Sequence, residues 1–153
     1  LKKTYPRFTE EERNIMKGHT CIGAQLFDPE QSLLEKMSWE ITLHHHDRWD
    51  GSEYGYPGKI DIKQVYIKVG DTIPLCEPLS GEDIPLSARI VAVADVFDAL
   101  SCKRCYKEAW PVEEAFNEIE RCSGTQFDPE IVAAFLLIKD RIIAIKNAYQ
   151  DDE

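Results

Sequence analysis

The chain has 153 residues, 43% of them hydrophobic, which suits one soluble globular domain with a sizeable core. Its formal charge of −10 argues against general binding to nucleic-acid polymers or anionic membranes, which needs a basic face. No stretch approaches the roughly 20 apolar residues of a membrane helix, so we expect no membrane contact in this segment. Five cysteines without a dense framework favour reduced thiols, and we expect a cytoplasmic location.

The first predicted helix begins at Thr9, because Thr9 and Glu12 have the spacing of a capping box. Apolar residues then recur at helical spacing, and His19 shares their inward face. A second helix is predicted from about Pro29, and it delivers the triplet His44-His45-His46 at its C-terminal end. The apolar stripe of this second helix consists of Leu33, Leu34, Met37 and Ile41.

The pattern changes in the segment between Pro57 and Leu79. Apolar and polar residues alternate over residues 60–69, and Gly70-Asp71 supplies a turn. A second short strand over residues 72–75 would complete the pair. We therefore predict a small β-hairpin near residues 59–78.

The remaining segments again predict helices. Residues 85–100 are apolar nearly all round, which predicts a helix buried on most sides. Asp95 and Asp98 lie within it, and a buried carboxylate needs a cation such as a metal ion to compensate its charge. Two amphipathic helices over residues 112–122 and 131–149 are predicted to be structural.

The triplet is followed directly by Asp47, so three imidazoles and a carboxylate are clustered in four residues. Imidazole is the commonest neutral metal ligand in proteins, and this cluster predicts half of a metal site. Consecutive histidines on a helix point in different directions, which leaves one of the three open to a surface or supporting role.

Several motifs agree in type and order with one known family. They are Met16-Lys17-Gly18-His19, the triplet followed by Trp49-Asp50-Gly51, Gly55-Tyr56-Pro57, the run from Gly81 to Leu100, Arg104-Cys105-Tyr106-Lys107, and Gly124-Thr125-Gln126-Phe127-Asp128-Pro129. From about Phe8 to Phe135 the chain resembles the HD-GYP family, a branch of the HD phosphohydrolases that hydrolyses cyclic di-GMP. The resemblance implies an all-α, HD-domain-like helical bundle formed by one domain over residues 1–153, with the hairpin near 59–78 as an insertion.

The resemblance also assigns roles to matching positions. It implies metal coordination by His19, His45, His46 and Asp95, and contacts to a cyclic dinucleotide from Tyr56, Arg104 and Lys107. Two or three divalent ions, Fe or Mn, would activate a hydroxide and neutralise phosphate charge. Asp47 would support a ligand without binding the metal itself.

Besides the insertion near residues 59–78, the chain departs from the family pattern in two further places. It lacks the H-D-x-x-K motif that the family carries before the position of His19, so the catalytic residues of that motif are unknown. We expect a C-terminal, N-terminally truncated part of a longer bacterial signalling protein with an upstream sensor or receiver domain, inactive on its own. Glu53-Tyr54 interrupts the loop before Gly55, which puts the nucleotide preference in doubt.

The leading functional expectation is a metal-dependent phosphodiesterase that converts cyclic di-GMP to pGpG or GMP. Two alternatives stay open. One is a catalytically inactive regulatory module that only binds a cyclic dinucleotide, and the other is an HD hydrolase for a different phosphoester. Formation of a homodimer is also left open by the sequence.

Overall fold

The computed structural model describes residues 8–103 and 109–149, and within these ranges the protein is helical with no strand ladder. The helices are α1 (Glu10–Lys17), α2 (His19–Ala24), α3 (Leu33–His44), α4 (Leu86–Ser101), α5 (Val112–Arg121), α6 (Pro129–Leu137) and α7 (Lys139–Ala148), with a short 3₁₀ helix, η1 (Gly81–Asp83), before α4. The predicted all-α fold class is confirmed. Among the described helices, none combines the length and apolar character needed to cross a membrane.

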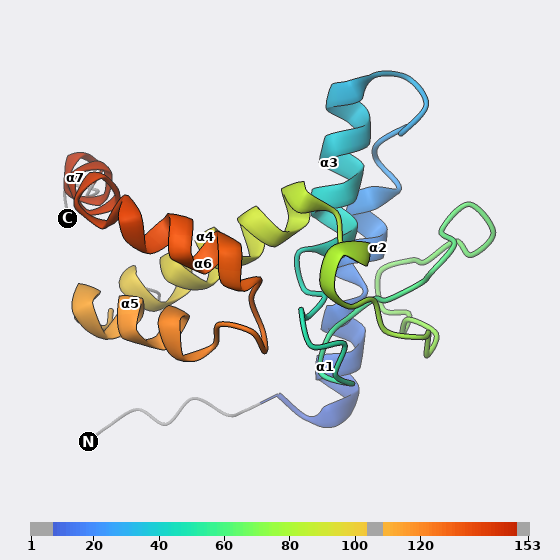
Figure 1. The fold of residues 1–153 in the computed structure, drawn as a ribbon. Coiled ribbons are helices and arrows are strands. Elements are labelled where there is room, and N and C mark those ends of the chain that lie inside the picture. Colours follow the sequence, from blue (N-terminus) through green and yellow to red (C-terminus); the bar gives the residue numbers. More distant parts are fainter. Residues whose placement is uncertain (1–7, 104–108, 150–153) are drawn as a thin grey trace.

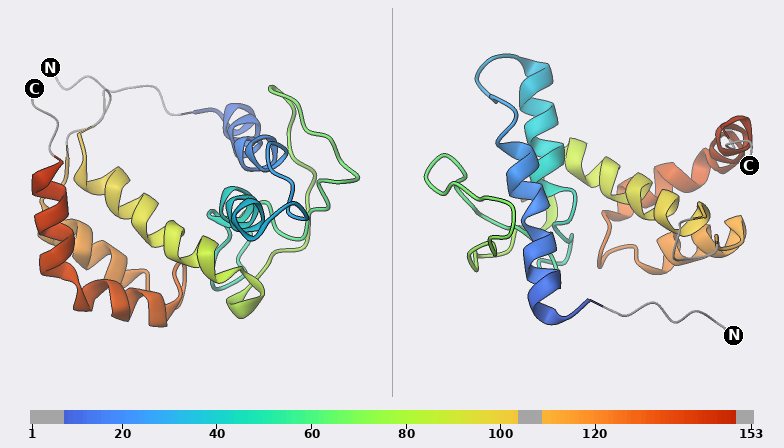
Figure 2. Two further views of the ribbon diagram at one scale, coloured as in Figure 1. Left: turned by 90° about the horizontal axis from the view of Figure 1, so that it is seen from above. Right: turned by 180° about the vertical axis from the view of Figure 1, so that it is seen from behind.

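Helix α4 connects two groups of helices. Figure 1 shows α1–α3 and the loops of residues 45–84 on one side of α4, and α5–α7 on the other. The view from above in Figure 2 shows the same division. Helix α4 contacts α3 on the first side and α5 and α6 on the second. It is therefore the structural link between the two groups.

Local capping determines where the first helices begin. The predicted capping box is confirmed, because the Glu12 backbone N–H donates to Thr9 Oγ1 over 3.1 Å and the Thr9 N–H donates to Glu12 over 2.8 Å. Helix α3 begins at Leu33 and not near Pro29, because Ser32 is its N-cap and accepts the Glu35 N–H.

Two predicted long helices are each divided in the structure. The first ends at Lys17, and Gly18 separates it from α2, which starts at His19. The helix predicted over residues 131–149 is broken at Ile138, the residue between α6 and α7. Because of the break at Gly18, His19 is the first residue of α2.

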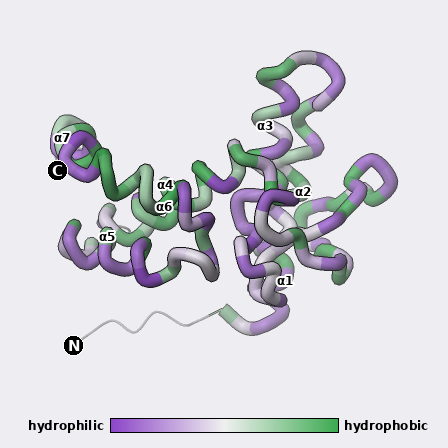
Figure 3. Tube along the Cα trace, in the orientation of Figure 1, coloured by the Kyte–Doolittle hydropathy of each residue, from purple (hydrophilic) through white to green (hydrophobic). Residues whose placement is uncertain are grey.

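The buried apolar residues form two clusters, one on each side of the molecule. The C-terminal core contains Ala92, Val93, Phe97, Ala115, Phe116, Ile119, Phe127 and Val132. The N-terminal core contains Cys21, Ala24, Leu43, Ile60, Ile62 and Ile67. Figure 3 shows that hydrophobic residues are concentrated along α4 and α6, whereas hydrophilic residues dominate much of the loop region.

Two predicted burial patterns are wrong. Leu33, Leu34 and Met37 of α3 are 77%, 72% and 43% exposed, so the apolar stripe of α3 is not a core face in the described structure. Helix α4 is not buried on most sides either, because Leu86 and Ile90 are about half exposed. A sequence pattern identifies an apolar face but not whether another element covers it.

The predicted β-hairpin near residues 59–78 is not formed. Apart from the hydrogen bond from the Lys59 N–H to the Glu77 carbonyl over 2.9 Å, the backbone bonds of this segment are local turns. The alternation arises instead because Ile60, Ile62 and Ile67 are buried in the N-terminal core. The Gln25 side chain donates to the Ile67 carbonyl and accepts the Ile67 N–H, so it replaces a strand partner.

This packing makes the segment a part of the core, contrary to the expectation for a simple surface insertion. We expect Ile67→Ala to lower the free energy of unfolding by about 2–5 kcal/mol, because Ile67 is 4% exposed and its loss leaves a cavity. Val69→Ala, two residues away at a side chain that is 88% exposed, is the control and should change stability little. Equal stability of both variants in urea unfolding would contradict the placement of Ile67.

Candidate metal centre

Three of the four histidines converge at the junction of α1, α2 and the end of α3. One ligand atom from each of His19, His45 and His46 lies within 4.8 Å of the others. The ring centroids are 5.6 Å apart for His19 and His45, 5.1 Å for His19 and His46, and 4.1 Å for His45 and His46. His19 is exposed, which corrects the inward position predicted for it, and the other two are half-buried, so the cluster opens to solvent at His19.

Backbone carbonyls fix the orientation of two of these rings. His19 Nδ1 lies 2.7 Å from the Met16 carbonyl, and His45 Nδ1 lies 2.9 Å from the Ile41 carbonyl. A carbonyl oxygen can only accept, so Nδ1 of each neutral ring carries the hydrogen and Nε2 keeps its lone pair. A tautomer fixed in this way by an outer partner is typical of metal-binding histidines.

His46 is held neutral by its surroundings. Burial, together with the nearby His45 and His19, lowers the pKa of His46 to about 3. A metal ligand must be unprotonated, so His46 can bind a metal ion at neutral pH without first losing a proton.

Tyr56 forms one wall of the histidine cluster. Its ring stacks on His46 with centroids 4.8 Å apart and an interplanar angle of 26°, and its backbone N–H donates to the His46 carbonyl. Burial first, and the charge of Asp95 second, raise the pKa of Tyr56 to about 12. The phenol therefore stays protonated and can donate a hydrogen bond to an anion beside the cluster.

Asp95 is not one of the residues whose ligand atoms lie within 4.8 Å of one another. It is half-buried on α4, and its carboxylate is near enough to influence Tyr56. Its role as a metal ligand therefore stays a prediction. Asp98 is exposed, which corrects its predicted burial, and it accepts a hydrogen bond from the Cys102 thiol.

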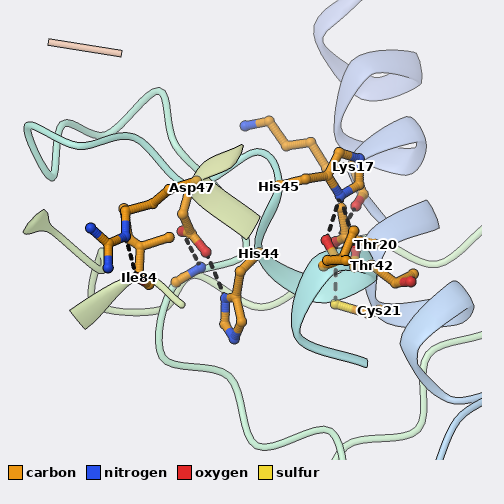
Figure 4. A network of polar contacts seen from close by, with 11 residues as sticks. Lys17, Thr20, Cys21, Thr42, His44, His45, Asp47 and Ile84 are labelled. Carbon is orange, nitrogen blue, oxygen red and sulfur yellow. Dashed lines mark hydrogen bonds and ion pairs between the residues drawn. The ribbon is translucent and has the colours of Figure 1, made fainter. Parts of the chain in front are cut away.

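The first histidine of the triplet has a different environment. His44 is 7% exposed, and its Nδ1 lies 2.7 Å from Asp47, which is 5% exposed. The other carboxylate oxygen of Asp47 accepts the Gly58 N–H over 2.9 Å. Figure 4 shows the His44–Asp47 contact and, separate from it, the contacts around Lys17, Thr20 and His45. Asp47 thus connects the loop that contains Tyr56 and Gly58 to His44 at the end of α3, and His44 lies outside the metal cluster.

Only glycine fits at Gly58. Its φ is +74°, and an added Cβ would lie 2.4 Å from the Glu77 carbonyl oxygen. With glycine at this position, the backbone passes close to the Glu77 carbonyl and the Gly58 N–H donates to Asp47. The position of Tyr56 therefore depends on both Asp47 and Gly58.

The loop after the triplet is also tied to the second group of helices. The N–H groups of Trp49 and Asp50 donate to the carbonyls of Gln126 and Thr125. Arg89 on α4 donates to the buried Asp128 over 2.6 Å and lies over the Trp49 ring. The motif from Gly124 to Pro129 is thus structural, since it anchors the loop that carries Tyr56.

Arg104 and Lys107, which the sequence assigned to substrate contacts, lie outside the described residues. Sequence reasoning did not single out Lys17 as a member of this site. Its Nζ lies 5.4 Å from the centroid of the Tyr56 ring. The signal available in the sequence was its position two residues before His19.

Two profiles described as HD domain match the chain, over residues 2–100 and residues 70–131. The first covers more than half of the sequence and includes all four histidines. The chain belongs to the HD domain family. The HD-GYP resemblance seen in the motifs is in agreement with this assignment.

Curated relatives of this HD domain are bacterial phosphodiesterases. The chain is 40% identical over 145 residues to the cyclic di-GMP phosphodiesterase of Thermotoga maritima, covering 95% of the chain and 34% of the relative. It is 42% identical over 130 residues to the cyclic di-GMP phosphodiesterase response regulator RpfG of Xanthomonas campestris pv. campestris, covering 85% and 29%. It is 36% identical over 141 residues to the 3'3'-cGAMP-specific phosphodiesterase 2 of Vibrio cholerae, covering 92% and 23%. The chain spans about a third or less of the length of these relatives.

Proposed function

We propose that this HD domain hydrolyses a phosphodiester bond of a cyclic dinucleotide, with cyclic di-GMP as the first candidate and pGpG or GMP as the product. The observation that carries the proposal is the convergence of His19, His45 and His46, with ligand atoms within 4.8 Å and two rings oriented by carbonyls. Three neutral nitrogen donors at a solvent-open position suit a catalytic divalent ion. The names of the relatives supply the substrate class.

We propose separate roles in this reaction for the metal-binding residues and the substrate-binding residues. The three imidazoles would hold a divalent ion, which would supply Lewis acidity towards a phosphate oxygen. We propose Asp95 as a further ligand, and two or three Fe or Mn ions as the metal content. Tyr56, protonated because its pKa is raised to about 12, donates to a phosphate oxygen and holds the substrate against His46. Arg104 and Lys107 are proposed to bind the remaining phosphate and guanine groups.

A second candidate substrate is the mixed dinucleotide 3'3'-cGAMP, which two of the relatives are named for. In the alternative of a binding-only module, the protein binds the cyclic dinucleotide through Tyr56, Arg104 and Lys107 but does not hydrolyse it. We further propose that the whole protein acts in cytoplasmic signalling, with a sensor or receiver domain in the same chain. The response regulator among the relatives supports this context.

The proposal is tested by incubating the full-length protein with cyclic di-GMP, 3'3'-cGAMP or bis(p-nitrophenyl) phosphate under ferrous or manganous ion. We expect hydrolysis of cyclic di-GMP that EDTA abolishes and added metal restores, with pGpG or GMP resolved by chromatography. Preference for 3'3'-cGAMP would support the second candidate. Binding without turnover under every metal condition would support the binding-only module, and neither binding nor turnover would refute the proposal.

A further inference from the structure

Lys17 is the last residue of α1, directly before the break at Gly18 that introduces His19. Its side chain is half-buried, and its Nζ lies 5.4 Å from the centroid of the Tyr56 ring. The same ring stacks on His46, so the ammonium group and the histidine cluster share one neighbour. Figure 4 labels Lys17 beside His45 and Thr20, in a group separate from the His44–Asp47 pair.

Lys17 has no acidic partner among residues 8–103 and 109–149. Several other lysines of this acidic chain are paired, namely Lys36 with Glu40, Lys59 with Glu77, Lys63 with Glu30 and Lys139 with Glu113. A half-buried ammonium loses part of its hydration, and an aromatic face compensates only part of that loss. The position is therefore suited to an anion that arrives from outside.

A structural role at the helix end is the competing explanation, because a lysine in the last turn of a helix interacts favourably with the helix dipole. That role does not require the amino group to lie over Tyr56. The position of the Lys17 amino group over Tyr56 also places a positive charge close to a site that a divalent cation would occupy. Such a charge opposes metal binding unless an anion lies between the two cations.

We propose that Lys17 binds a phosphate of the cyclic dinucleotide through its ammonium group, together with the Tyr56 hydroxyl. This inference rests on the proposed function and adds a substrate-binding residue on α1 to the expected residues Tyr56, Arg104 and Lys107. Lys17 supplies charge to the bound phosphate and takes no part in holding the metal.

The test compares Lys17→Met and Lys17→Arg in the full-length protein, with Lys36→Met as the control for loss of an exposed lysine. We expect Lys17→Met to raise KM for cyclic di-GMP, and to weaken its equilibrium binding to EDTA-treated protein, by about tenfold, the usual effect of losing one charge-assisted hydrogen bond. The value of kcat should change less than threefold. Lys17→Arg should restore most of the affinity.

Metal content separates this role from the alternatives. We expect Lys17→Met to bind as much Mn as the wild type or more, with an unchanged melting temperature. Unchanged substrate affinity in Lys17→Met, or a loss of affinity accompanied by reduced metal content or stability, would overturn the inference while leaving the proposed function intact. If Lys17→Met does not fold, a failure of Lys17→Arg to retain affinity overturns it as well. A wild type that neither binds nor hydrolyses the dinucleotide would overturn both proposals.

Discussion

His46→Ala is expected to remove the bound metal and abolish phosphodiester hydrolysis. The imidazole of His46 is a neutral donor within 4.8 Å of the other two histidine donors, and its loss leaves two of the three described donors of this cluster. Loss of a ligand should weaken metal binding by more than about 100-fold, since changes outside the ligand set already cost 10–100-fold. Metal stoichiometry after dialysis and a hydrolysis assay measure the two effects.

The matched control lies two residues earlier in the same triplet. His44→Ala removes an imidazole that contacts Asp47 and lies outside the metal cluster. We expect this variant to keep its metal stoichiometry but to lose about 3 kcal/mol of stability, because the buried Asp47 carboxylate loses a hydrogen-bond partner. His46→Ala should therefore lose metal, whereas His44→Ala should lose stability and keep its metal. Loss of metal in His44→Ala, with retention in His46→Ala, would refute the assignment.

Arg89→Met is expected to destabilise the protein by about 3–5 kcal/mol. The guanidinium of Arg89 pairs with Asp128, whose side chain is 2% exposed, and removing the cation leaves a buried charged carboxylate with only the Glu130 N–H as a partner. Arg89 also lies over the Trp49 ring and donates to the Ile84 carbonyl, so its loss removes one contact to the loop that follows the histidine triplet. Chemical denaturation measures the change in the free energy of unfolding.

Arg121→Met supplies the comparison for this effect. Arg121 also pairs with a carboxylate, that of Glu118, but its side chain is 70% exposed. Water screens an exposed pair, so we expect little change in stability. The double variant Arg89→Met/Asp128→Asn should recover part of the loss, because asparagine removes the buried charge and keeps an oxygen that can accept the Glu130 N–H at the N-cap of α6. Equal destabilisation by Arg89→Met and Arg121→Met would contradict the burial of the Asp128 pair.

The capping box of α1 and the position of the triplet at the end of α3 were predictable because both depend on residues close together in the sequence. The bond between Thr9 and Glu12 spans three residues, and the delivery of His45 by α3 follows from apolar spacing over twelve residues. The membership of the HD domain family was likewise visible in short motifs. These features require no knowledge of what the helices pack against.

Only the tertiary structure shows which histidines of the triplet join the metal cluster and which one does not. All three histidines have the same chemistry, and the structure shows that His44 contacts Asp47, which also accepts the Gly58 N–H, instead of joining the cluster. The segment of residues 59–78 shows the same limit. Its alternating pattern fits a hairpin, but Gln25 on another element satisfies the Ile67 backbone, and the isoleucines pack on α2 and α3.

By itself the sequence determined the helical class, the capping box at the start of α1 and the clustering of three histidines at the end of α3, because these depend on local spacing and side-chain chemistry. The tertiary structure decided which histidines converge, which apolar faces are covered and where Lys17 lies. Those properties arise from contacts between residues far apart in the chain, such as Lys17 with Tyr56 and Arg89 with Asp128. Only the folded chain brings such residues within reach of one another, so no local pattern could reveal them.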